Sequence, residues 1–559
     1  MDAATAFPPL TDGQLDRLRA AGRERDVAAG DLLFREGEAA YDFFVVLDGA
    51  VAVYEDLACR RPISPEPLGP RQFLGEVGLL LGEGVYATAR VEAPGRVLQV
   101  PAERFRALVG ADTDLAETVL AAFTARRGIV AEGPSGLTIV GARTSPDAAR
   151  LAEFARRNYL PARWLDPDSP DAQGVLERHG RTAEGLDGSG PLVVWGSETA
   201  LDNPTPLELA RAVGIGREPP PESTADLLIV GAGPAGLAAA VYGASEGLAT
   251  VVLDEVGAGG QAGASSRIEN YLGFPAGLSG TELATRATLQ ARKFGARFVT
   301  PHRAVALGRD GDAYAVALAD GPRVRARAVV LATGAHYRRL PVPDLRRFEG
   351  AGVYYAATEM EARVCGGATA VVVGGGNSAG QAALFLAERA ARVLLLLRGD
   401  DVGKSMSRYL ADRVEASEAV EVRPHTEVRQ LHGDDALRAV TVEETEAGRT
   451  EQVEAPALFV FIGAEPCTAW LRGGAEGSLG LALDGHGFVR TGADVADLDG
   501  AWWPDGRRPS TFETSLPGVF AVGDVRSGST KRVAGAVGEG AVTVKAVHAR
   551  LAPPRTPVD

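Results

Sequence analysis

The stretch Ala225-Asp226-Leu227-Leu228-Ile229-Val230-Gly231-Ala232-Gly233-Pro234-Ala235-Gly236 decides the fold of the C-terminal part of this chain. Its first six residues form an apolar strand, and a helix-forming run follows over residues 237–244. In a GxGxxG turn the first glycine permits the bend, the second lets the backbone approach a pyrophosphate, and the third lets helix and strand pack closely. The pyrophosphate would meet the free N–H groups at the start of the helix. The stretch therefore predicts a dinucleotide-binding β–α unit.

A carboxylate completes this first unit. The next predicted strand, over residues 250–253, ends in Asp254. This position is roughly 20 residues after the glycine turn, where such units carry an acid that accepts the ribose hydroxyls. The strand, turn, helix and acid in this order are far more specific than the glycines alone.

A second unit of the same kind lies further along the chain. Residues 370–373 form an apolar strand that enters Gly374-Gly375-Gly376-Asn377-Ser378-Ala379, and a predicted helix then runs to Ala390. Two dinucleotide-binding units in one chain indicate that two nucleotide cofactors meet.

The strand after the second turn, residues 393–397, ends in Arg398 rather than in an acid. An arginine suits the 2′-phosphate of NADP, which it can grip with two hydrogen bonds, whereas an acid would favour NAD. We expect NADP rather than NAD, with Lys404 and Arg408 assisting. The alternative for these two residues is that they are solvated loop charges.

Composition excludes several classes of function. The 559 residues carry a net charge of −15, so a polyanion such as nucleic acid is not expected as a partner. The three cysteines, Cys59, Cys365 and Cys467, form no CxxC, and the histidines form no HxxxH, so no metal site is expected. No apolar run reaches about 18 residues, and no basic start precedes an apolar core, which together predict a cytoplasmic protein without a membrane segment.

Two segments resemble linkers, residues 131–136 and the proline-rich residues 216–224. They divide the chain into residues 1–131, 137–215 and 225–559. The first part alternates short strands with glycine turns, which predicts a small antiparallel barrel or jelly roll. The second part reads strand, helix, strand, helix, strand, helix, which predicts a compact α/β unit.

Residues 225–550 resemble the bacterial thioredoxin reductase family of FAD- and pyridine-nucleotide-dependent disulfide oxidoreductases. The motifs that carry the resemblance follow the family's order and lie at residues 231–236, 259–261, 269–275, 332–335, 374–379 and 520–525. The resemblance implies an FAD domain built from residues 225–340 and 466–550, an NAD(P) domain of residues 341–465 inserted in it, and a homodimer.

The resemblance also implies roles for individual residues. Asp524 would hydrogen-bond the ribityl chain of FAD, the segment Arg532-Val533-Ala534 would lie along the flavin ring, and Gln261 and Asn270 would contact the ring or the ribityl groups. The residues expected to bind FAD are Gly231, Gly233, Pro234, Ala235, Gly236, Asp254, Gly260, Gln261, Asn270, Ala332, Thr333, Gly334, Gly523, Asp524, Arg532, Val533 and Ala534. Those expected to bind NAD(P) are Gly374, Gly376, Asn377, Ser378, Arg398 and Arg408.

One motif of the family is missing. Its redox pair, Cys-Ala-Thr-Cys, corresponds here to Ala356-Ala357-Thr358-Glu359, which can carry neither a thiolate nor a disulfide. Cys365 is expected to be a buried apolar residue at the start of the next strand. Electrons must then pass from the flavin to another acceptor: a quinone, an iron–sulfur or flavin protein, or oxygen. Glu359 would relay a proton if it faces the flavin; the alternative is a polar filler at a lost site.

Residues 137–215 resemble the thioredoxin or glutaredoxin fold, with Pro191 expected as the cis-proline before a strand. The start of the first helix, residues 143–147, carries no cysteine. We therefore expect a docking or spacer domain without redox activity, and the alternative is a flavodoxin-like fragment.

Residues 10–130 resemble the cyclic-nucleotide-binding domain family through residues 30–38, 43–49 and 73–80. In that family the Gly75-Glu76 pair would begin the phosphate cassette, with the acid on the ribose 2′-hydroxyl. Ala87 stands where the arginine for the cyclic phosphate belongs, and Arg90 is out of register. Losing that charge-assisted pair costs roughly 1.5–3 kcal/mol. A regulatory or interaction domain is therefore favoured over one that binds a cyclic nucleotide.

The sequence thus predicts a multidomain protein: an N-terminal β jelly roll, a small thioredoxin-like α/β domain, and an α/β pair of FAD and NAD(P) domains. The function favoured is an FAD-dependent NAD(P)H oxidoreductase with a non-disulfide acceptor and a fused sensor-like domain. Two alternatives remain. One is a thioredoxin-disulfide reductase that uses an unrecognised thiol route, and the other is a non-catalytic sensor of nucleotide or redox cofactor.

Overall fold

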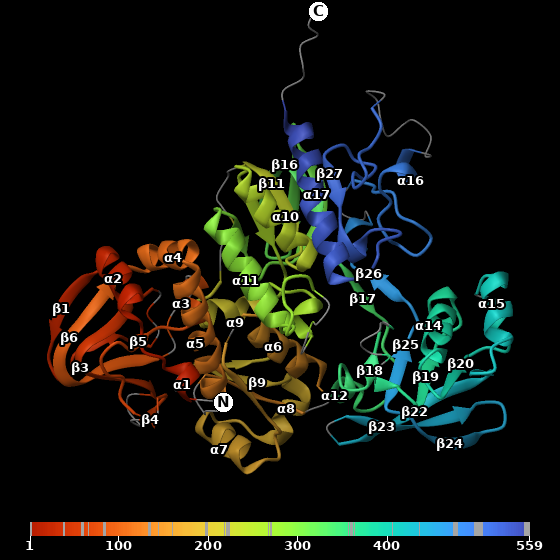
Figure 1. Cartoon of the computed structure of the whole chain (residues 1–559), viewed down its shortest axis with the longest axis horizontal. Helices are drawn as coiled ribbons and strands as arrows, with labels where there is room; N and C mark the ends of the chain where they lie inside the picture. Colours follow the sequence, from red (N-terminus) through yellow and green to blue (C-terminus); the bar gives the residue numbers. More distant parts are fainter. Residues whose placement is uncertain are drawn as a thin grey trace, which may run out of the picture. The chain divides into compact units, whose positions relative to one another are not determined.

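The structure of the chain is a computed structural model (Figure 1). It describes residues 3–36, 38, 40–56, 61–64, 66–81, 85, 87–131, 136–142, 145–158, 160–195, 199–216, 219, 224–265, 268, 271–355, 357, 362, 364–404, 406–434, 436–472, 479–496 and 507–552. The chain divides into two compact units, one of residues 1–334, 468–484 and 489–559, and the other of residues 335–467 and 485–488.

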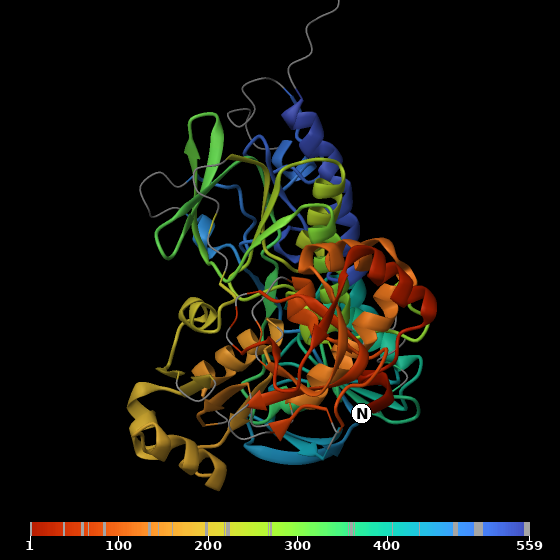
Figure 2. The ribbon, with the colours of Figure 1, turned by 90° about the vertical axis from the view of Figure 1, so that its left-hand side faces the viewer.

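The N-terminal domain is an antiparallel β structure, which Figure 2 turns toward the viewer. Its elements are α1 (Ala3–Ala6), α2 (Asp12–Ala21), β1 (Arg23–Val27), β2 (Leu32–Phe34), β3 (Phe43–Asp56), β4 (Arg61–Pro62), β5 (Phe73–Leu74), α3 (Val77–Leu81), β6 (Thr88–Val100), α4 (Ala102–Ala111) and α5 (Thr113–Ala131). The long strands β3 and β6 pair along most of their length, and β1, β2, β4 and β5 add to them. Buried residues of β3 and β6 belong to the same core cluster as Phe105 of α4 and Phe123 of α5, so this core joins sheet and helices.

The middle domain carries a mixed sheet with strand order β10-β9-β7-β8. Its elements are β7 (Leu137–Val140), α6 (Pro146–Arg157), β8 (Ala162–Leu165), α7 (Pro170–Arg178), α8 (Ala183–Ser189), β9 (Leu192–Trp195), β10 (Thr199–Asp202) and α9 (Pro206–Ala212). Strands β7 and β8 are parallel, and β9 and β10 run antiparallel to their neighbours.

Two details of the middle domain differ from the sequence prediction. Strand β10 was not predicted, because its four residues alternate too little to stand out and it forms only by pairing with β9. Pro191 is not a cis-proline. Gly190, at φ 78°, makes the turn into β9, and within the described residues the cis peptide bond is at Thr300-Pro301.

The rest of the first unit is built on a largely parallel sheet. Its elements are β11 (Thr224–Val230), α10 (Pro234–Ser245), β12 (Thr250–Leu253), η1 (Ala262–Ala264), α11 (Gly280–Lys293), β13 (Arg297–Val299), β14 (Ala304–Asp310), β15 (Ala313–Leu318), β16 (Arg323–Leu331), η3 (Ala469–Leu471), α16 (Ala493–Ala496), β27 (Val519–Ala521), η5 (Gly523–Val525) and α17 (Val533–Leu551). Strands β13, β12, β11, β16 and β27 are parallel, and the β14–β15 hairpin joins the sheet through β16. The apolar strand β11 lies inside this sheet, as a strand buried on both faces requires.

Figure 1 shows α10 and α17 lying side by side over this sheet. The two helices are far apart in sequence, yet Gly540 of α17 leaves so little room that a Cβ there would lie 2.1 Å from the Ala235 carbonyl oxygen. This close contact brings α17, near the C-terminal end of the chain, against the start of α10.

The second unit contains a parallel sheet with strand order β18-β25-β19-β20-β21. Its elements are β17 (Ala335–Tyr337), α12 (Leu345–Phe348), β18 (Val353–Tyr354), β19 (Thr369–Val373), α14 (Asn377–Ala387), β20 (Arg392–Leu396), η2 (Val402–Lys404), α15 (Arg408–Glu415), β21 (Val420–Arg423), β22 (Thr426–Gly433), β23 (Leu437–Glu444), β24 (Arg449–Glu454), β25 (Ala457–Val460) and β26 (Ala464–Pro466). Strands β22, β23 and β24 form a separate antiparallel sheet, and β17 pairs with β26. Across the described residues of the whole chain, no helix combines the length and apolarity needed to cross a membrane.

Candidate cofactor-binding sites

The first glycine turn joins β11 to α10 and leaves no room for side chains. Gly231 has φ 109°, and a Cβ there would lie 2.3 Å from the Ala332 carbonyl oxygen. A Cβ on Gly236 would lie only 1.9 Å from the Gly231 carbonyl oxygen. Gly233 is the N-cap of α10, no side chain caps the helix there, and Pro234 and Ala235 follow in its first turn. The free N–H groups of this first turn are therefore available to an anion.

Three further segments close around the turn. Gly259 donates its N–H to the Ala232 carbonyl at 2.8 Å. Gly260, at φ 56°, approaches so closely that a Cβ on it would lie 2.8 Å from Gly233 Cα. On the other side Ala332, at the end of β16, donates its N–H to the Val230 carbonyl at 2.8 Å, and Thr333 and Gly334 follow it. The segments at residues 231–236, 259–260 and 332–334, which lie far apart in sequence, thus line one cradle of backbone.

Asp254 connects the end of β12 to this cradle. Its Oδ2 accepts a hydrogen bond from the Ala232 N–H at 2.8 Å, and its Oδ1 accepts from the N–H groups of Val256 and Gly257 at 3.0 and 2.9 Å. A carboxylate has about four acceptor positions, so one remains for a ribose hydroxyl. The sequence pattern located this acid but did not indicate that it also holds the glycine turn.

The C-terminal motif meets the same turn. Gly523, at φ 71°, lies against Ala235, since a Cβ on Gly523 would be 2.9 Å from the Ala235 Cβ. Its N–H donates to Glu539 Oε2 of α17 at 2.7 Å, and Glu539 also pairs with Arg526. Sequence reasoning missed Glu539, although an acid inside an otherwise apolar helix was a usable signal.

Asp524, the next residue, is half-buried. Burial raises the pKa of this carboxyl, Glu539 raises it further, and Lys531 opposes the shift. Arg532 is the N-cap of α17 and is exposed. A half-buried carboxylate at this position can accept hydrogen bonds from hydroxyl groups.

The other expected FAD residues have less defined surroundings. Val533 is half-buried, Ala534 is exposed, and Gln261 is exposed at the start of η1. Asn270 lies outside the described residues.

These features fit FAD. The backbone cradle would be filled by any Cβ at Gly231, Gly236 or Gly260, and an uncapped helix start suits a pyrophosphate. Asp254 lies beside the cradle for a ribose, and Asp524 lies on its far side at Gly523.

The second glycine turn, between β19 and α14, is similar but looser. Gly374 has φ 137°, and a Cβ there would lie 2.4 Å from the Phe461 carbonyl oxygen. Gly376 is the N-cap of α14, which again has no side-chain cap. Asn377 accepts a hydrogen bond from the Ser407 N–H at 2.7 Å, and Ser378 is exposed beside it. This helix start also offers free N–H groups to a phosphate.

The basic residues near the second turn have different surroundings. Arg398 is exposed two residues after β20. Lys404 donates to Asp400 at 2.7 Å, and Arg408 pairs with Asp412 at 2.8 Å, both across one turn on exposed surfaces. Lys404 and Arg408 thus pair with neighbouring acids on exposed surfaces, and Arg408 begins α15 instead of lying in a loop.

The position of the missing redox pair is only partly described. Ala356, Thr358 and Glu359 lie outside the described residues. Cys365 is buried, which raises the pKa of its thiol to about 11, so its expected burial is confirmed. It precedes β19 in a turn instead of starting the strand. Cys467, the other described cysteine, is half-buried.

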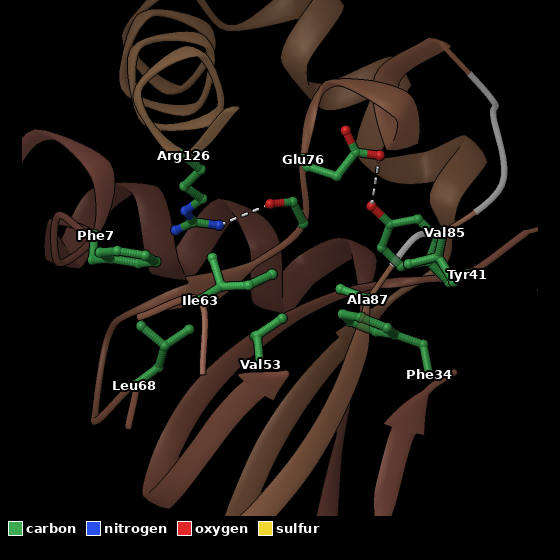
Figure 3. A pocket seen from close by; sticks show the side chains of 11 residues that line it. Phe7, Phe34, Tyr41, Val53, Ile63, Leu68, Glu76, Val85, Ala87 and Arg126 are labelled. Carbon is green, nitrogen blue, oxygen red and sulfur yellow. Dashed lines mark hydrogen bonds between the residues drawn. The ribbon is translucent and has the colours of Figure 1, made fainter. Parts of the chain in front are cut away.

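The N-terminal domain contains a cavity at the expected phosphate cassette (Figure 3). Glu76 and Ala87 line it, as the resemblance to cyclic-nucleotide-binding domains implied. Arg126 of α5 also lines it and was missed by the sequence analysis. An arginine pair at 126–127 in an apolar helix was the only sequence signal for it.

Comparisons with known proteins agree with this arrangement. Residues 225–540 match the family model described as pyridine nucleotide-disulphide oxidoreductase, and residues 24–112 match the cyclic nucleotide-binding domain. Thioredoxin reductase of Streptomyces clavuligerus is 32% identical over 56% of this chain and 90% of its own length. Thioredoxin reductase of Bacillus subtilis is 30% identical over 58% of this chain and 95% of its own length.

Solved structures give the same result. Thioredoxin reductase from Giardia duodenalis is 25% identical, with a TM-score of 0.52 over 59% of this chain and all of that chain. That from Streptococcus pyogenes is 28% identical, with a TM-score of 0.51 over 59% of this chain and 98% of that chain. The predicted enzyme class and its cofactors, FAD and NAD(P)H, are confirmed at the level of the family. The chain therefore belongs to the pyridine nucleotide-disulphide oxidoreductase family, as a thioredoxin-reductase-like enzyme with a fused cyclic nucleotide-binding domain.

Proposed function

We propose that this protein transfers electrons from NAD(P)H through FAD to an acceptor that is not a protein disulfide. One observation carries the proposal: both glycine turns keep their geometry, while Ala356 and Glu359 stand where the family has its redox cysteines. Bound FAD supplies the chemistry, because its ring accepts a hydride and can release electrons to a second substrate. A quinone, an iron–sulfur or flavin protein, and oxygen are the acceptor classes that fit.

The chain's own residues would bind and orient the two cofactors. The backbone around Gly231, Gly233 and Gly260 would hold the FAD pyrophosphate, and Asp254 would accept a ribose hydroxyl. Asp524 would bind the ribityl chain. At the second turn, Gly376 would receive the NAD(P)H pyrophosphate at the start of α14, and Arg398 would bind a 2′-phosphate.

None of the three cysteines of the chain, Cys59, Cys365 and Cys467, belongs to a CxxC pair that could replace the missing one. The raised pKa of Cys365 keeps it protonated near neutral pH, and a thiol is a far weaker nucleophile than a thiolate. Cys467 is half-buried and has no second cysteine near it in the sequence with which to form a redox pair. Disulfide reduction by the family's mechanism is therefore not expected.

The middle domain is part of the same proposal. Its strand order, with β7 and β8 parallel and β9 and β10 antiparallel, supports a thioredoxin- or glutaredoxin-like fold. Residues 137–215 contain no cysteine. We assign this domain a docking or spacing role, within a protein expected to be a cytoplasmic homodimer.

Anaerobic reduction tests the function. We expect a yellow protein whose absorbance near 450 nm bleaches on addition of NADPH and returns when a quinone is added. We expect no reduction of a thioredoxin disulfide. Rapid thioredoxin reduction by the unchanged protein would contradict the proposal, and a flavin that neither NADPH nor NADH reduces would point to a non-catalytic sensor.

A variant that restores the pair is the matched control. The double substitution Ala356→Cys and Glu359→Cys recreates the family's Cys-Ala-Thr-Cys spacing. We expect it to gain disulfide reductase activity over the unchanged protein, with flavin bleaching by NADPH unaltered. If the double variant gains no disulfide reductase activity, this chain differs from its relatives in more than the two missing cysteines.

Glu359 is proposed as a proton relay. Glu359→Gln keeps the size of the side chain and removes its acid–base function. We expect the variant to oxidise NAD(P)H more slowly with proton-consuming acceptors such as quinones. If the variant and the unchanged protein have equal rates with every acceptor, Glu359 has no such role.

A further inference from the structure

The end of α6 in the middle domain contacts the loop that closes over the first glycine turn. This loop, residues 256–263, follows Asp254 and ends within η1, and it belongs to the same compact unit as the middle domain. Val256 packs against the core of the middle domain, a cluster that includes Leu151 and Phe154 of α6. The middle domain and the loop are therefore joined by apolar packing as well as by the hydrogen bonds described next.

Asn158, the C-cap of α6, holds the start of the loop. It is buried, and its Nδ2 donates to the Val256 carbonyl at 2.7 Å and to the Phe154 carbonyl at 2.9 Å. A Cβ on Gly257 would lie 3.0 Å from Nδ2 of Asn158, so the side chain lies directly against the loop backbone. One buried amide thus ties the last turn of α6 to the loop.

Arg156 holds the end of the same loop. Its Nη1 donates to the Gly263 carbonyl at 2.5 Å and to Thr281 Oγ1 at 3.3 Å, and Thr281 itself donates to the Gly263 carbonyl at 3.0 Å. Glu153, one turn earlier in α6, accepts from Nε and Nη2 of Arg156 at 2.9 and 2.7 Å. Such a two-bonded pair fixes the plane of the guanidinium, so Nη1 is directed at the loop.

The loop also contacts the cradle that fits FAD. Its residues Gly259 and Gly260 lie against the glycine turn of residues 231–236, the first through a hydrogen bond and the second by close approach. Val256 makes both kinds of contact, because its N–H donates to Asp254 while its carbonyl accepts from the middle domain. The middle domain thus holds both ends of a segment whose centre belongs to the cofactor cradle.

We propose that α6 positions the FAD-binding loop, and that Arg156 and Asn158, acting as positioning residues, raise the affinity of the protein for FAD. A loop that is already held in its bound conformation loses less conformational entropy when the ligand binds. The proposal rests on the FAD site proposed above and gives the middle domain a role beyond docking or spacing. Residues 137–215 lie outside both segments that match a family model, so the resemblance does not supply this role.

The affinity of the full-length apoprotein for FAD, measured by equilibrium dialysis, tests the proposal. Arg156→Met removes the donor to the loop and keeps an unbranched side chain. We expect its dissociation constant for FAD to rise about tenfold, because a hydrogen bond from a charged donor is lost. Arg156→Lys keeps a cationic donor and should restore most of the affinity. Asn158→Asp keeps the shape but replaces the donor with an acceptor, and a loss of roughly two- to tenfold is expected for a neutral hydrogen bond.

Arg150→Met is the matched control. Arg150 lies on the same helix, and its side chain is 34% exposed against 32% for Arg156. It donates to Asp147, Asn203 and the Pro204 carbonyl, all within the middle domain. This change disturbs the middle domain and spares the loop contacts, so FAD affinity should stay within twofold of that of the unchanged protein. Thermal unfolding of every variant shows whether the protein remains folded.

Hydrogen exchange provides a readout that a merely structural role would not move. Coupling between two sites is reciprocal, so a contact that strengthens FAD binding must itself be strengthened by FAD. We expect FAD to slow amide exchange in residues 151–158 of the unchanged protein and of Arg150→Met, and to slow it less in Arg156→Met.

Three results would overturn the proposal and leave the oxidoreductase function intact. They are an unchanged FAD affinity in Arg156→Met, an equal loss of affinity in Arg150→Met and Arg156→Met, and the absence of any effect of FAD on exchange in residues 151–158. Failure of the unchanged protein to bind FAD would instead refute the oxidoreductase function on which the proposal rests.

Discussion

The two glycine turns of this chain share one local sequence pattern and differ in how tightly they are built. In the first, α10 starts so close to the strand that Gly236 has no room for a Cβ. In the second, the same position is Ala379, whose methyl group is fully buried without disturbing the turn. The first turn is also enclosed by residues 259–260, 332–334 and 523, while Leu397, Phe461 and Ser407 approach the second.

The acid that follows the first turn and the arginine that follows the second also differ in how firmly the surrounding backbone holds them. Asp254 is bonded to three backbone N–H groups and is part of the cradle. Arg398 is exposed in a loop. The difference teaches that the first turn is held by more of the surrounding backbone than the second, and should tolerate substitution less well.

The largest effect is expected at Gly236. Gly236→Val would place a Cβ 1.9 Å from a carbonyl oxygen, so the turn cannot form and the protein should purify without flavin. The ratio of absorbance at 450 nm to that at 280 nm measures this. The matched change in the other turn, Ala379→Gly, should keep the flavin and cost about 0.5–1 kcal/mol of stability. Normal flavin content in Gly236→Val would show that the first turn is not more tightly built than the second.

A smaller loss is expected at Asp254. Asp254→Ala removes the acceptor of three backbone N–H groups as well as a ribose contact. Charge-assisted hydrogen bonds contribute roughly 1.5–3 kcal/mol, so FAD affinity should fall about 10- to 100-fold. Equilibrium dialysis of the reconstituted apoprotein measures the change, and an unchanged affinity would refute the bracing role.

At the second turn, we expect one residue, Arg398, to determine the KM for NADPH. We expect Arg398→Ala to raise KM for NADPH about tenfold and to leave KM for NADH unchanged, because only NADPH carries a 2′-phosphate. Lys404→Ala and Arg408→Ala are the controls. Both residues already pair with acids on exposed surfaces, so each should change KM less than twofold. A large increase in KM for either control variant would show that the substituted residue does bind the nucleotide.

The smallest effect concerns the thiol of Cys365, which precedes β19, the strand that leads into the second turn. Burial raises the pKa of Cys365 to about 11, so the reactive thiolate should be about 0.1% of the thiol at pH 8 and increase tenfold per pH unit toward pH 11. In a Cys59→Ser and Cys467→Ser background, mass spectrometry of iodoacetamide-treated protein at several pH values measures this. Complete alkylation within minutes at pH 7 would show an accessible thiolate instead.

Much of the fold followed from local patterns. Apolar strands before glycine turns identified both dinucleotide units, because a buried parallel strand must be apolar on both faces. The β-rich N-terminal domain also followed from alternating strands and glycines. Strand β10 and the trans bond before Pro191 did not follow, because a neighbouring strand and a turn at Gly190 decide them.

The residues of the candidate sites also divide into those that the sequence indicates and those that only the structure reveals. Glycines and terminal acids have fixed spacings from a strand, so Gly231 and Asp254 could be predicted. Arg126 and Glu539 were missed. Each stands out as a charge in an apolar helix, but the backbone segment on which it acts cannot be read from the sequence: Phe73 and Gly75 for Arg126, and Gly523 for Glu539. Burial and backbone partners of that kind exist only in three dimensions.

The pairing of β17 with β26 bears on whether the residues between these two strands can be deleted. Ala335 pairs with Pro466 in antiparallel register, so the polypeptide enters and leaves the nicotinamide unit at one point. Paired Cα atoms in such a ladder lie about 4.5–5.5 Å apart, a gap that two or three glycines can bridge. We therefore expect that a chain from which residues 335–467 are deleted still folds into a yellow flavin domain.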